Sequence, residues 1–332
     1  MNSSSSSTPP TDPPVPPLTI PAPPLLNVPP TQLRSPTDGV HTDTTPRTTP
    51  PDSTPQTAQT RRIGKAVLQA IEGTLSDRDR QVLGSIQRHR FLTTGHIQTL
   101  HFADHASPSA GARATRSVLE RLRKHRLVAT LDRRIGGIYG GSSTPTYFLD
   151  TAGIRLVSDA SKRRRHEPSR TFVQHTLAIA DTTVALTMAE RAGQIELIAA
   201  DPEPSCWRRY PGLGGVAVTL KPDLHAVTAP GPDSDFEDSW FIEIDLGTET
   251  IPTLIRKCRE YEAYRRSGTE QDRAGVFPIV VWVMSAPNVE TAQRRIHSLT
   301  AQIARSDDLS DAIFRIITPD QLIPLIQKGG TS

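Results

Sequence analysis

The sequence predicts a mixed α and β protein with two folded regions, and three observations lead to this prediction. The first 60 of the 332 residues hold 16 of the 30 prolines and no aromatic residue. Residues 61–165 carry 20 Lys/Arg against 8 Asp/Glu, whereas residues 166–332 carry 16 against 23. In both of these regions, apolar residues at helical spacing alternate with short β-like runs. We therefore expect a tail, a basic folded region and an acidic folded region.

Residues 1–60 have the composition of a disordered Pro/Ser/Thr-rich tail, because their few apolar residues follow no period and bury little surface. We interpret this tail as a spacer, with a flexible tether or a polyproline ligand as the alternative. It lacks the basic start and apolar core of a signal peptide. The most apolar run, residues 276–284, is about half as long as a membrane helix. We expect a cytoplasmic protein without a membrane partner.

The two cysteines, Cys206 and Cys258, are far apart and have no His or Cys neighbours at ligand spacing. This spacing argues against a zinc site and against a disulfide framework. A reducing cytoplasm is the simplest setting for such a chain.

The basic region predicts three helices. Ser76 or Asp77 is the expected N-cap of the first helix, and Thr93 or Thr94 is the expected N-cap of the second. The third helix is expected from about residue 109 to residue 125, with apolar residues on one side and arginines on the other.

A β-hairpin with a basic tip is predicted after these helices. Residues 127–131 and 146–149 read as its strands, and the glycine-rich loop between them carries Arg133 and Arg134. A short helix is expected at residues 151–157. Three helices followed by a hairpin is the order of a winged helix-turn-helix, which we assign to residues 61–160. A basic linker at residues 161–170 follows.

The third helix of a winged helix-turn-helix enters the major groove of DNA, and the wing contacts the backbone or the minor groove. Arg113 and Arg116 lie where base edges would be reached, and an arginine fork contacts guanine in a bidentate way. The other cations are expected to meet phosphates. The predicted DNA-binding residues are Arg113, Arg116, Arg121, Arg123, Lys124, Arg133, Arg134, Lys162, Arg163, Arg164 and Arg165. The alternative is a solvated helix surface on a protein-interaction module.

The acidic region predicts an α/β domain at residues 171–325, followed by a short tail at residues 326–332. It opens with a long helix at about residues 172–192 and continues with several strands. Glu243 and Asp245 stand two apart on a predicted strand, so both side chains point to one face. Lys257 and Tyr261 stand four apart on the helix predicted at residues 251–266 and share one side of it.

A helix, then strands that carry Asp223, Glu243 and Asp245, then another helix is the order of restriction-endonuclease-like nucleases. Three carboxylates at adjacent strand ends are suited to hold Mg²⁺, which would polarise a phosphodiester and activate water. The pattern departs from the active form, because Asp245 stands where a lysine is expected. Lys257 is the first candidate for the missing cation, and Lys221 is the second.

The predicted catalytic set is therefore Asp223, Glu243, Asp245 and Lys257, with the three acids as metal ligands. The alternative for Glu243 and Asp245 is an ion-paired sheet edge in a domain without catalysis, and we prefer a non-catalytic domain to cleavage. We interpret His175, early on the long helix, as a polar helix residue rather than a ligand.

Five stretches of the chain form a set that points to one family. These stretches are Leu75–Asp79, Thr146–Gly153, His175–Asp181, Lys221–Leu224 and Phe241–Glu249. Lys257 and Tyr261 match the helix that ends the pattern. With these residues the chain resembles the replication-relaxation family of plasmids and other mobile elements, found mainly in actinobacteria, over about residues 75–325. The resemblance implies a role in plasmid replication, or in DNA relaxation and mobilisation.

Three functions follow from these patterns. The first is a DNA-binding accessory protein at a plasmid origin or transfer site, with double-stranded DNA and plasmid replication or relaxase proteins as partners. The second is a Mg²⁺-dependent DNA nuclease or nickase that uses Asp223, Glu243 and Asp245. The third is a protein-interaction module that binds a replication partner.

Overall fold

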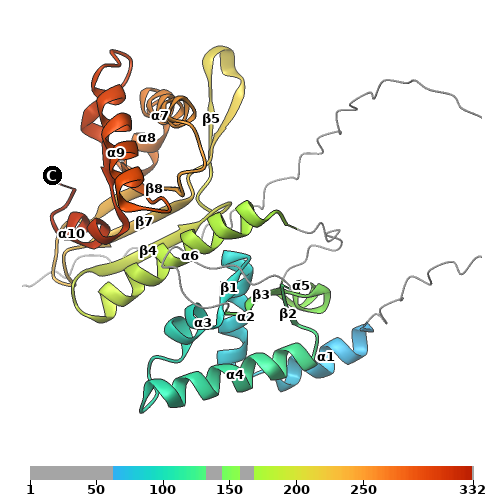
Figure 1. The fold of residues 1–332 in the computed structure, drawn as a ribbon. Coiled ribbons are helices and arrows are strands. Elements are labelled where there is room, and N and C mark those ends of the chain that lie inside the picture. Colours follow the sequence, from blue (N-terminus) through green and yellow to red (C-terminus); the bar gives the residue numbers. More distant parts are fainter. Residues whose placement is uncertain (1–62, 132–143, 158–167, 331–332) are drawn as a thin grey trace, which may run out of the picture. The chain divides into compact units, whose positions relative to one another are not determined.

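The computed structural model describes residues 63–131, 144–157 and 168–330, and these residues belong to one compact unit, Arg61–Ser332. Helices and strands are mixed along this unit, so the predicted mixed α and β class is confirmed (Figure 1). None of the described helices combines the length and the apolar character needed to cross a membrane.

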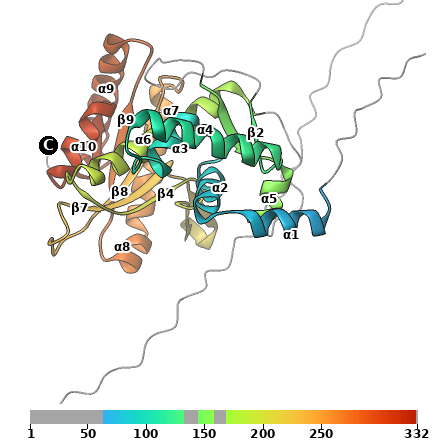
Figure 2. The ribbon, with the colours of Figure 1, turned by 90° about the horizontal axis from the view of Figure 1, so that it is seen from below.

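The described residues up to 157, which we call the N-terminal module, are mainly helical. Their helices are α1 (Lys65–Thr74), α2 (Asp77–His89), α3 (Thr94–His101), α4 (Pro108–Lys124) and α5 (Thr151–Val157). The last four helices confirm the predictions made from the sequence, whereas α1 was not predicted. Figure 2 shows α1, α2 and α5 together on one side of the module, in agreement with the contacts of α5 with both other helices.

Local capping explains where two of these helices begin. The Ser76 side chain accepts a hydrogen bond from the backbone N–H of Asp79, whose carboxylate accepts one from the backbone of Ser76. Thr93 and His96 make the equivalent reciprocal pair at the start of α3. Such a pair satisfies two backbone groups that the helix leaves free. Ser76 and Thr93 are thus confirmed as N-caps.

A small antiparallel sheet completes the N-terminal module. It contains β1 (Leu92–Thr93), β2 (Val128–Thr130) and β3 (Thr146–Leu149), in the order β1-β3-β2. Its strands and the helices share a core in which Leu83, Ile86 and Leu122 are fully buried. The tip of the predicted hairpin, with Arg133 and Arg134, lies outside the described residues.

The described residues from 168 onward, which we call the sheet module, contain a five-stranded mixed sheet and a two-stranded hairpin. The strands are β4 (Glu196–Pro202), β5 (Arg208–Pro211), β6 (Ala217–Leu220), β7 (Leu224–Ala229), β8 (Asp238–Asp245), β9 (Ile279–Met284) and β10 (Phe314–Ile317). The large sheet has the order β10-β9-β8-β7-β4. Strands β8, β9 and β10 run parallel, whereas β7 is antiparallel to both of its neighbours.

Helices cover both sides of the large sheet (Figure 1). The helices are α6 (Arg170–Arg191), α7 (Ile251–Arg266), α8 (Thr269–Ala274), α9 (Val289–Ala304) and α10 (Leu322–Gln327), with short 3₁₀ turns at Leu213–Gly215, Asp311–Ile313 and Pro319–Gln321. Helices α8 and α10 and the strand β5 were not predicted from the sequence.

Side-chain alternation along β8 decides which groups face which helices. Trp240 and Ile242 pack in the core formed with α6 and α10. Phe241 packs on the opposite side, in the core formed with α7 and α9. Because successive strand residues point to opposite faces, Glu243 and Asp245 lie on the same side as Phe241. The predicted shared face of these two carboxylates follows from this alternation.

Helix α6 also packs against the N-terminal module. Ala180 is part of the core cluster of that module, and α6 contacts α2 and α3. Nε2 of His96 on α3 lies 2.7 Å from Oδ1 of Asp181 on α6. Arg191, at the end of α6, donates hydrogen bonds to the backbone carbonyls of Thr99 and Leu100. The predicted domain boundaries around residues 161–170 stay a prediction, since residues 158–167 lie outside the described part.

Candidate functional site

A buried polar cluster lies where β7 begins and β8 ends. We use this name for His175, Asp223, Glu243, Lys257 and Tyr261. Asp223 directly precedes β7 and is 6% exposed. Its Oδ2 accepts a hydrogen bond of 2.8 Å from the backbone N–H of Ile244, and its Oδ1 lies 3.0 Å from Nε2 of His175. Strand β8 and helix α6 therefore hold this carboxylate from two sides.

His175 is a member of the cluster that the sequence analysis interpreted as an ordinary polar helix residue. Burial lowers the pKa of His175, but the hydrogen bond and the charge of Asp223 outweigh burial and raise this pKa above its usual value. The ring of His175 therefore stays protonated, and donates a hydrogen bond to Asp223, up to a higher pH than a free histidine ring would. The stretch His175–Asp181, one of the five that carry the family resemblance, was the available signal in the sequence. In the structure its first residue contacts Asp223 and its last contacts His96.

Glu243 occupies the centre of the cluster and is 2% exposed. Its Oε1 accepts a hydrogen bond of 2.5 Å from the hydroxyl of Tyr261, and its Oε2 lies 3.6 Å from Nζ of Lys257. Burial and the nearby charge of Asp223 raise the pKa of Glu243, against the opposing effect of Lys257. Lys257 and Tyr261 are one helical turn apart on α7, so their predicted shared side is what brings both to Glu243.

Lys257 serves two carboxylates. Its Nζ also lies 3.3 Å from Oε1 of Glu249. Burial alone would lower the pKa of Lys257, but the charges of Glu243, Asp223 and Glu249 outweigh burial and raise it. The second candidate, Lys221, instead places its Nζ over the Trp207 ring, 4.9 Å from the centroid. Of the two lysines, Lys257 is the one that contacts a predicted site carboxylate.

Asp245 does not share the cluster. Its Oδ2 accepts hydrogen bonds of 2.9 and 2.6 Å from Nε and Nη2 of Arg295 on α9. Its Oδ1 accepts one from the backbone N–H of Gly247. Two residues along a strand advance by about 6.6 Å, so a shared face does not bring Asp245 close to Glu243. Asp245 therefore has the ion-paired arrangement that was the alternative to metal binding.

The predicted three-carboxylate Mg²⁺ site does not fit this geometry. Within the described ranges, no group of three or more His, Cys, Asp or Glu side chains is arranged to hold a metal ion. Asp223 and Glu243 remain together, but each also accepts a hydrogen bond from the protein. We derive no metal-dependent step from this arrangement.

The predicted DNA-binding residues of α4 divide into two groups. Arg113, Arg116 and Lys124 are exposed and form no ion pair with any residue in the described part of the chain. They lie on the side of α4 opposite Leu122, which is fully buried. Arg113 lies three residues before Arg116, and Lys124 lies eight residues after it. These spacings place the three side chains on one side of a helix. We call Arg113, Arg116 and Lys124 the basic face.

The other two arginines of α4 are engaged within the N-terminal module. Nη2 of Arg121 lies 2.5 Å from Oδ1 of Asp79, whose side chain is only 1% exposed. Nη2 of Arg123 lies 3.2 Å from Oε2 of Glu120, in an exposed pair. The remaining predicted residues, Arg133, Arg134, Lys162, Arg163, Arg164 and Arg165, lie outside the described residues.

Two arginines of the N-terminal module contact the acidic sheet module, a role that the sequence analysis missed. Nη1 of Arg90 lies 3.1 Å from Oε1 of Glu203. Nη2 of Arg88 lies 3.9 Å from Oδ1 of Asp201. The opposite net charges of the two regions were the available signal, because they favour ion pairs between them.

These observations define a mixed α/β protein in which a helical module exposes a basic helix side and a sheet module buries a cluster of carboxylate, lysine and histidine groups. The chain belongs to the replication-relaxation family, since the family model for Replication-relaxation matches residues 83–280. The match includes α4, Asp223, Glu243 and Lys257. The resemblance seen in the sequence is thus confirmed. Comparisons with curated proteins and with solved structures found no match.

Proposed function

We propose that this chain is a cytoplasmic DNA-binding accessory protein of plasmid replication or DNA relaxation. Membership of the replication-relaxation family supports the replication or relaxation context. The observation that carries DNA binding is the basic face, where Arg113, Arg116 and Lys124 are exposed without an ion-pair partner among the described residues. Cations that are free of protein carboxylates are available to replace the counterions of DNA phosphates.

The order of elements supports a winged helix-turn-helix with α4 as the recognition helix. Helices α2, α3 and α4 precede the antiparallel pair β2–β3, and this is the order expected for that architecture. In this proposal Arg113 and Arg116, in the N-terminal half of α4, reach base edges, and Lys124 contacts the backbone. Arg121 supports α4 through Asp79 rather than binding DNA.

The sheet module is proposed to be restriction-endonuclease-like in fold and non-catalytic in function. Helix α6, the antiparallel pair β7–β8 and the connection from β8 through α7 to parallel β9 support this fold. The engagement of Asp245 by Arg295 supports a non-catalytic role. Binding of a plasmid replication protein or a relaxase by this module stays a prediction.

A salt titration tests the proposed DNA contact. Binding of the full-length protein to a labelled DNA duplex is measured by fluorescence anisotropy between about 50 and 200 mM salt. We expect a steep negative slope for the wild type, and a slope smaller in magnitude by about 2 to 3 for Arg113→Gln/Arg116→Gln/Lys124→Gln. The matched control is Arg256→Gln/Arg294→Gln/Arg305→Gln, which removes three exposed arginines of the sheet module.

The control variant should bind DNA as the wild type does, because it leaves the basic face intact. A shallow slope for the wild type would favour the protein-interaction alternative. An unchanged slope for the triple variant would show that α4 does not contact DNA.

A further inference from the structure

The hairpin of β5 and β6 stands beside α7 and extends away from the large sheet (Figure 1). One of its two faces packs inward. Tyr210 and Leu220 are buried in the core formed with α7, and the ring centroids of Tyr210 and Tyr264 lie 4.9 Å apart. Nε of Arg208 lies 3.1 Å from Oε2 of Glu270, which is fully buried. The aromatic and charged groups of this inner face are therefore engaged within the protein.

The opposite face of the hairpin, which we call the outer face, borders solvent. Arg209 pairs with Thr219 across the hairpin, and both point away from Tyr210 because side chains alternate along a strand. The same pairing and alternation assign six residues to this face: Trp207, Arg209, Pro211, Ala217, Thr219 and Lys221. Trp207 and Thr219 are partly exposed, and the other four are exposed.

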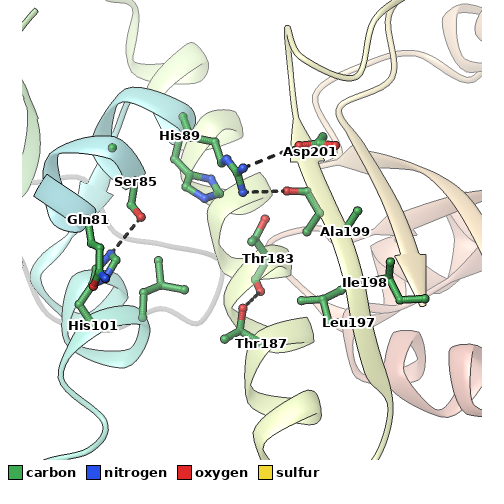
Figure 3. Close-up of a pocket in the computed structure, with 14 residues that line it drawn as sticks. Gln81, Ser85, His89, His101, Thr183, Thr187, Leu197, Ile198, Ala199 and Asp201 are labelled. Carbon is green, nitrogen blue, oxygen red and sulfur yellow. Dashed lines mark hydrogen bonds and ion pairs between the residues drawn. The ribbon is translucent and has the colours of Figure 1, made fainter. Parts of the chain in front are cut away.

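The outer face carries positive charge without a carboxylate. Its residues include Arg209 and Lys221 but no Asp or Glu, although residues 166–332 carry 16 Lys/Arg against 23 Asp/Glu. Neither cation forms an ion pair with any residue in the described ranges. Arg88, by contrast, has Oδ1 of Asp201 at 3.9 Å from its Nη2 (Figure 3). Arg209 and Lys221 are therefore available to an anionic ligand.

Trp207 adds an aromatic ring to the outer face. Nζ of Lys221 lies over this ring, 4.9 Å from the centroid, and Lys221 is exposed, so one ring face borders solvent. Nε1 of the indole is buried, so the ring offers a ligand stacking rather than a hydrogen bond. Stacking suits an unpaired base, because bases inside a duplex already stack on one another. An aromatic ring beside cations is a combination that proteins use to bind single strands.

We propose that the outer face of the hairpin binds single-stranded DNA. A base stacks on Trp207, and Arg209 and Lys221 contact the phosphates beside it. The flexible stem of Lys221 lets its ammonium group move from the ring to a phosphate. The choice of DNA over RNA rests on the proposed role in replication or relaxation, whereas the stacking and charge contacts do not depend on it. This surface is separate from the basic face of α4.

Fluorescence anisotropy with a labelled oligothymidylate of about 15 nucleotides tests this proposal. The full-length protein carries Arg113→Gln/Arg116→Gln/Lys124→Gln in every measurement, so that the basic face adds no attraction of its own. We expect binding with a Kd on the order of 10 µM at about 50 mM salt. No binding, or tighter binding of the matching oligouridylate, would overturn the assignment to single-stranded DNA.

Two substitutions at Trp207 test the stacking contact in this background. Trp207→Leu should weaken oligothymidylate binding about tenfold, whereas Trp207→Phe keeps a flat ring and should retain most of the affinity. The matched control is Phe236→Leu, which removes an aromatic ring that is 79% exposed elsewhere in the sheet module and should leave the affinity unchanged. Equal affinities of Trp207→Leu and Phe236→Leu proteins would refute stacking on Trp207.

Arg209→Gln/Lys221→Gln tests the phosphate contacts at two exposed positions, where the fold does not depend on the change. Each phosphate contact on a single strand contributes about 0.7 to the salt slope, so the slope should fall in magnitude by about 1.4. Arg294→Gln/Arg305→Gln removes two exposed arginines elsewhere in the sheet module and should leave the slope unchanged. An unchanged slope in the hairpin variant would overturn the proposal. Duplex binding by the wild type is a separate measurement, so the contact of α4 and the contact of the hairpin can fail independently.

Discussion

Nζ of Lys257 lies 3.6 Å from Oε2 of Glu243, between a helix and a strand of the sheet module. Glu243 is almost fully buried, while the side chain of Lys257 is 29% exposed. The same carboxylate accepts a hydrogen bond from the hydroxyl of Tyr261. Lys257 is thus the cation that compensates a buried acid, and this relationship gives the first prediction.

Lys257→Met should lower the free energy of unfolding by about 2 kcal/mol at pH 8, because it leaves Glu243 buried without its cation. Urea unfolding followed by circular dichroism measures this change. In the double variant Lys257→Met/Glu243→Gln the loss should be smaller, since the carboxylate that lost its cation has been removed as well. If Lys257→Met is as stable as the wild type, the contact does not compensate Glu243.

Arg121→Gln should destabilise the N-terminal module more than it weakens DNA binding. Burial raises the pKa of Asp79, but hydrogen bonds from Ser76 and Arg121 outweigh burial and lower it. A lowered carboxyl pKa stabilises the fold above the unfolded pKa, and this stability is lost as pH falls through the folded pKa. At pH 7 we expect a loss of about 1 to 2 kcal/mol in urea unfolding.

The comparison variant for Arg121 is Arg113→Gln, which should show the opposite pattern, with unchanged stability and weaker DNA binding. Anisotropy titrations of both variants provide the second readout. Equal losses of DNA affinity in the two variants would return Arg121 to the DNA-contacting residues.

The stability of the fold should depend on His89 at mildly acid pH. The pKa of His89 is about 4 in the folded state and 6.5 in a free histidine. Between these values the unfolded chain binds more protons, so stability is lost as pH falls from about 6.5 toward about 4. His89→Phe should remain folded to a lower pH than the wild type in an acid titration. The control is His297→Phe, at an exposed position, which should unfold at the same pH as the wild type. An identical acid midpoint for wild type and His89→Phe would contradict this prediction.

Supercoiled plasmid should stay intact when it is incubated with the protein and Mg²⁺ or Mn²⁺. The reason is that Arg295 engages Asp245 and the three predicted metal ligands do not form one group. Agarose gels of wild type and Asp223→Asn provide the measurement, and both proteins should leave the plasmid supercoiled. Nicking by the wild type that is lost in Asp223→Asn would restore the nuclease hypothesis.

Local features of this chain were determined by the sequence alone. Capping by Ser76 and Thr93, and the shared side of Lys257 and Tyr261, depend on residues three or four apart. Backbone geometry fixes such relationships within one helical turn. For the same reason the bounds of α7 and the shared face of Glu243 and Asp245 could be predicted before any packing was known.

The tertiary structure decided which partner each polar group has. His175 meets Asp223 across 48 residues of sequence, and Arg295 meets Asp245 across 50. No spacing rule covers such distances, because the contacts depend on how helices pack on the sheet. Burial then sets the cost of leaving a group unpaired. Only the folded arrangement shows which carboxylates are paired, and which arginines of α4 form no ion pair with the described residues.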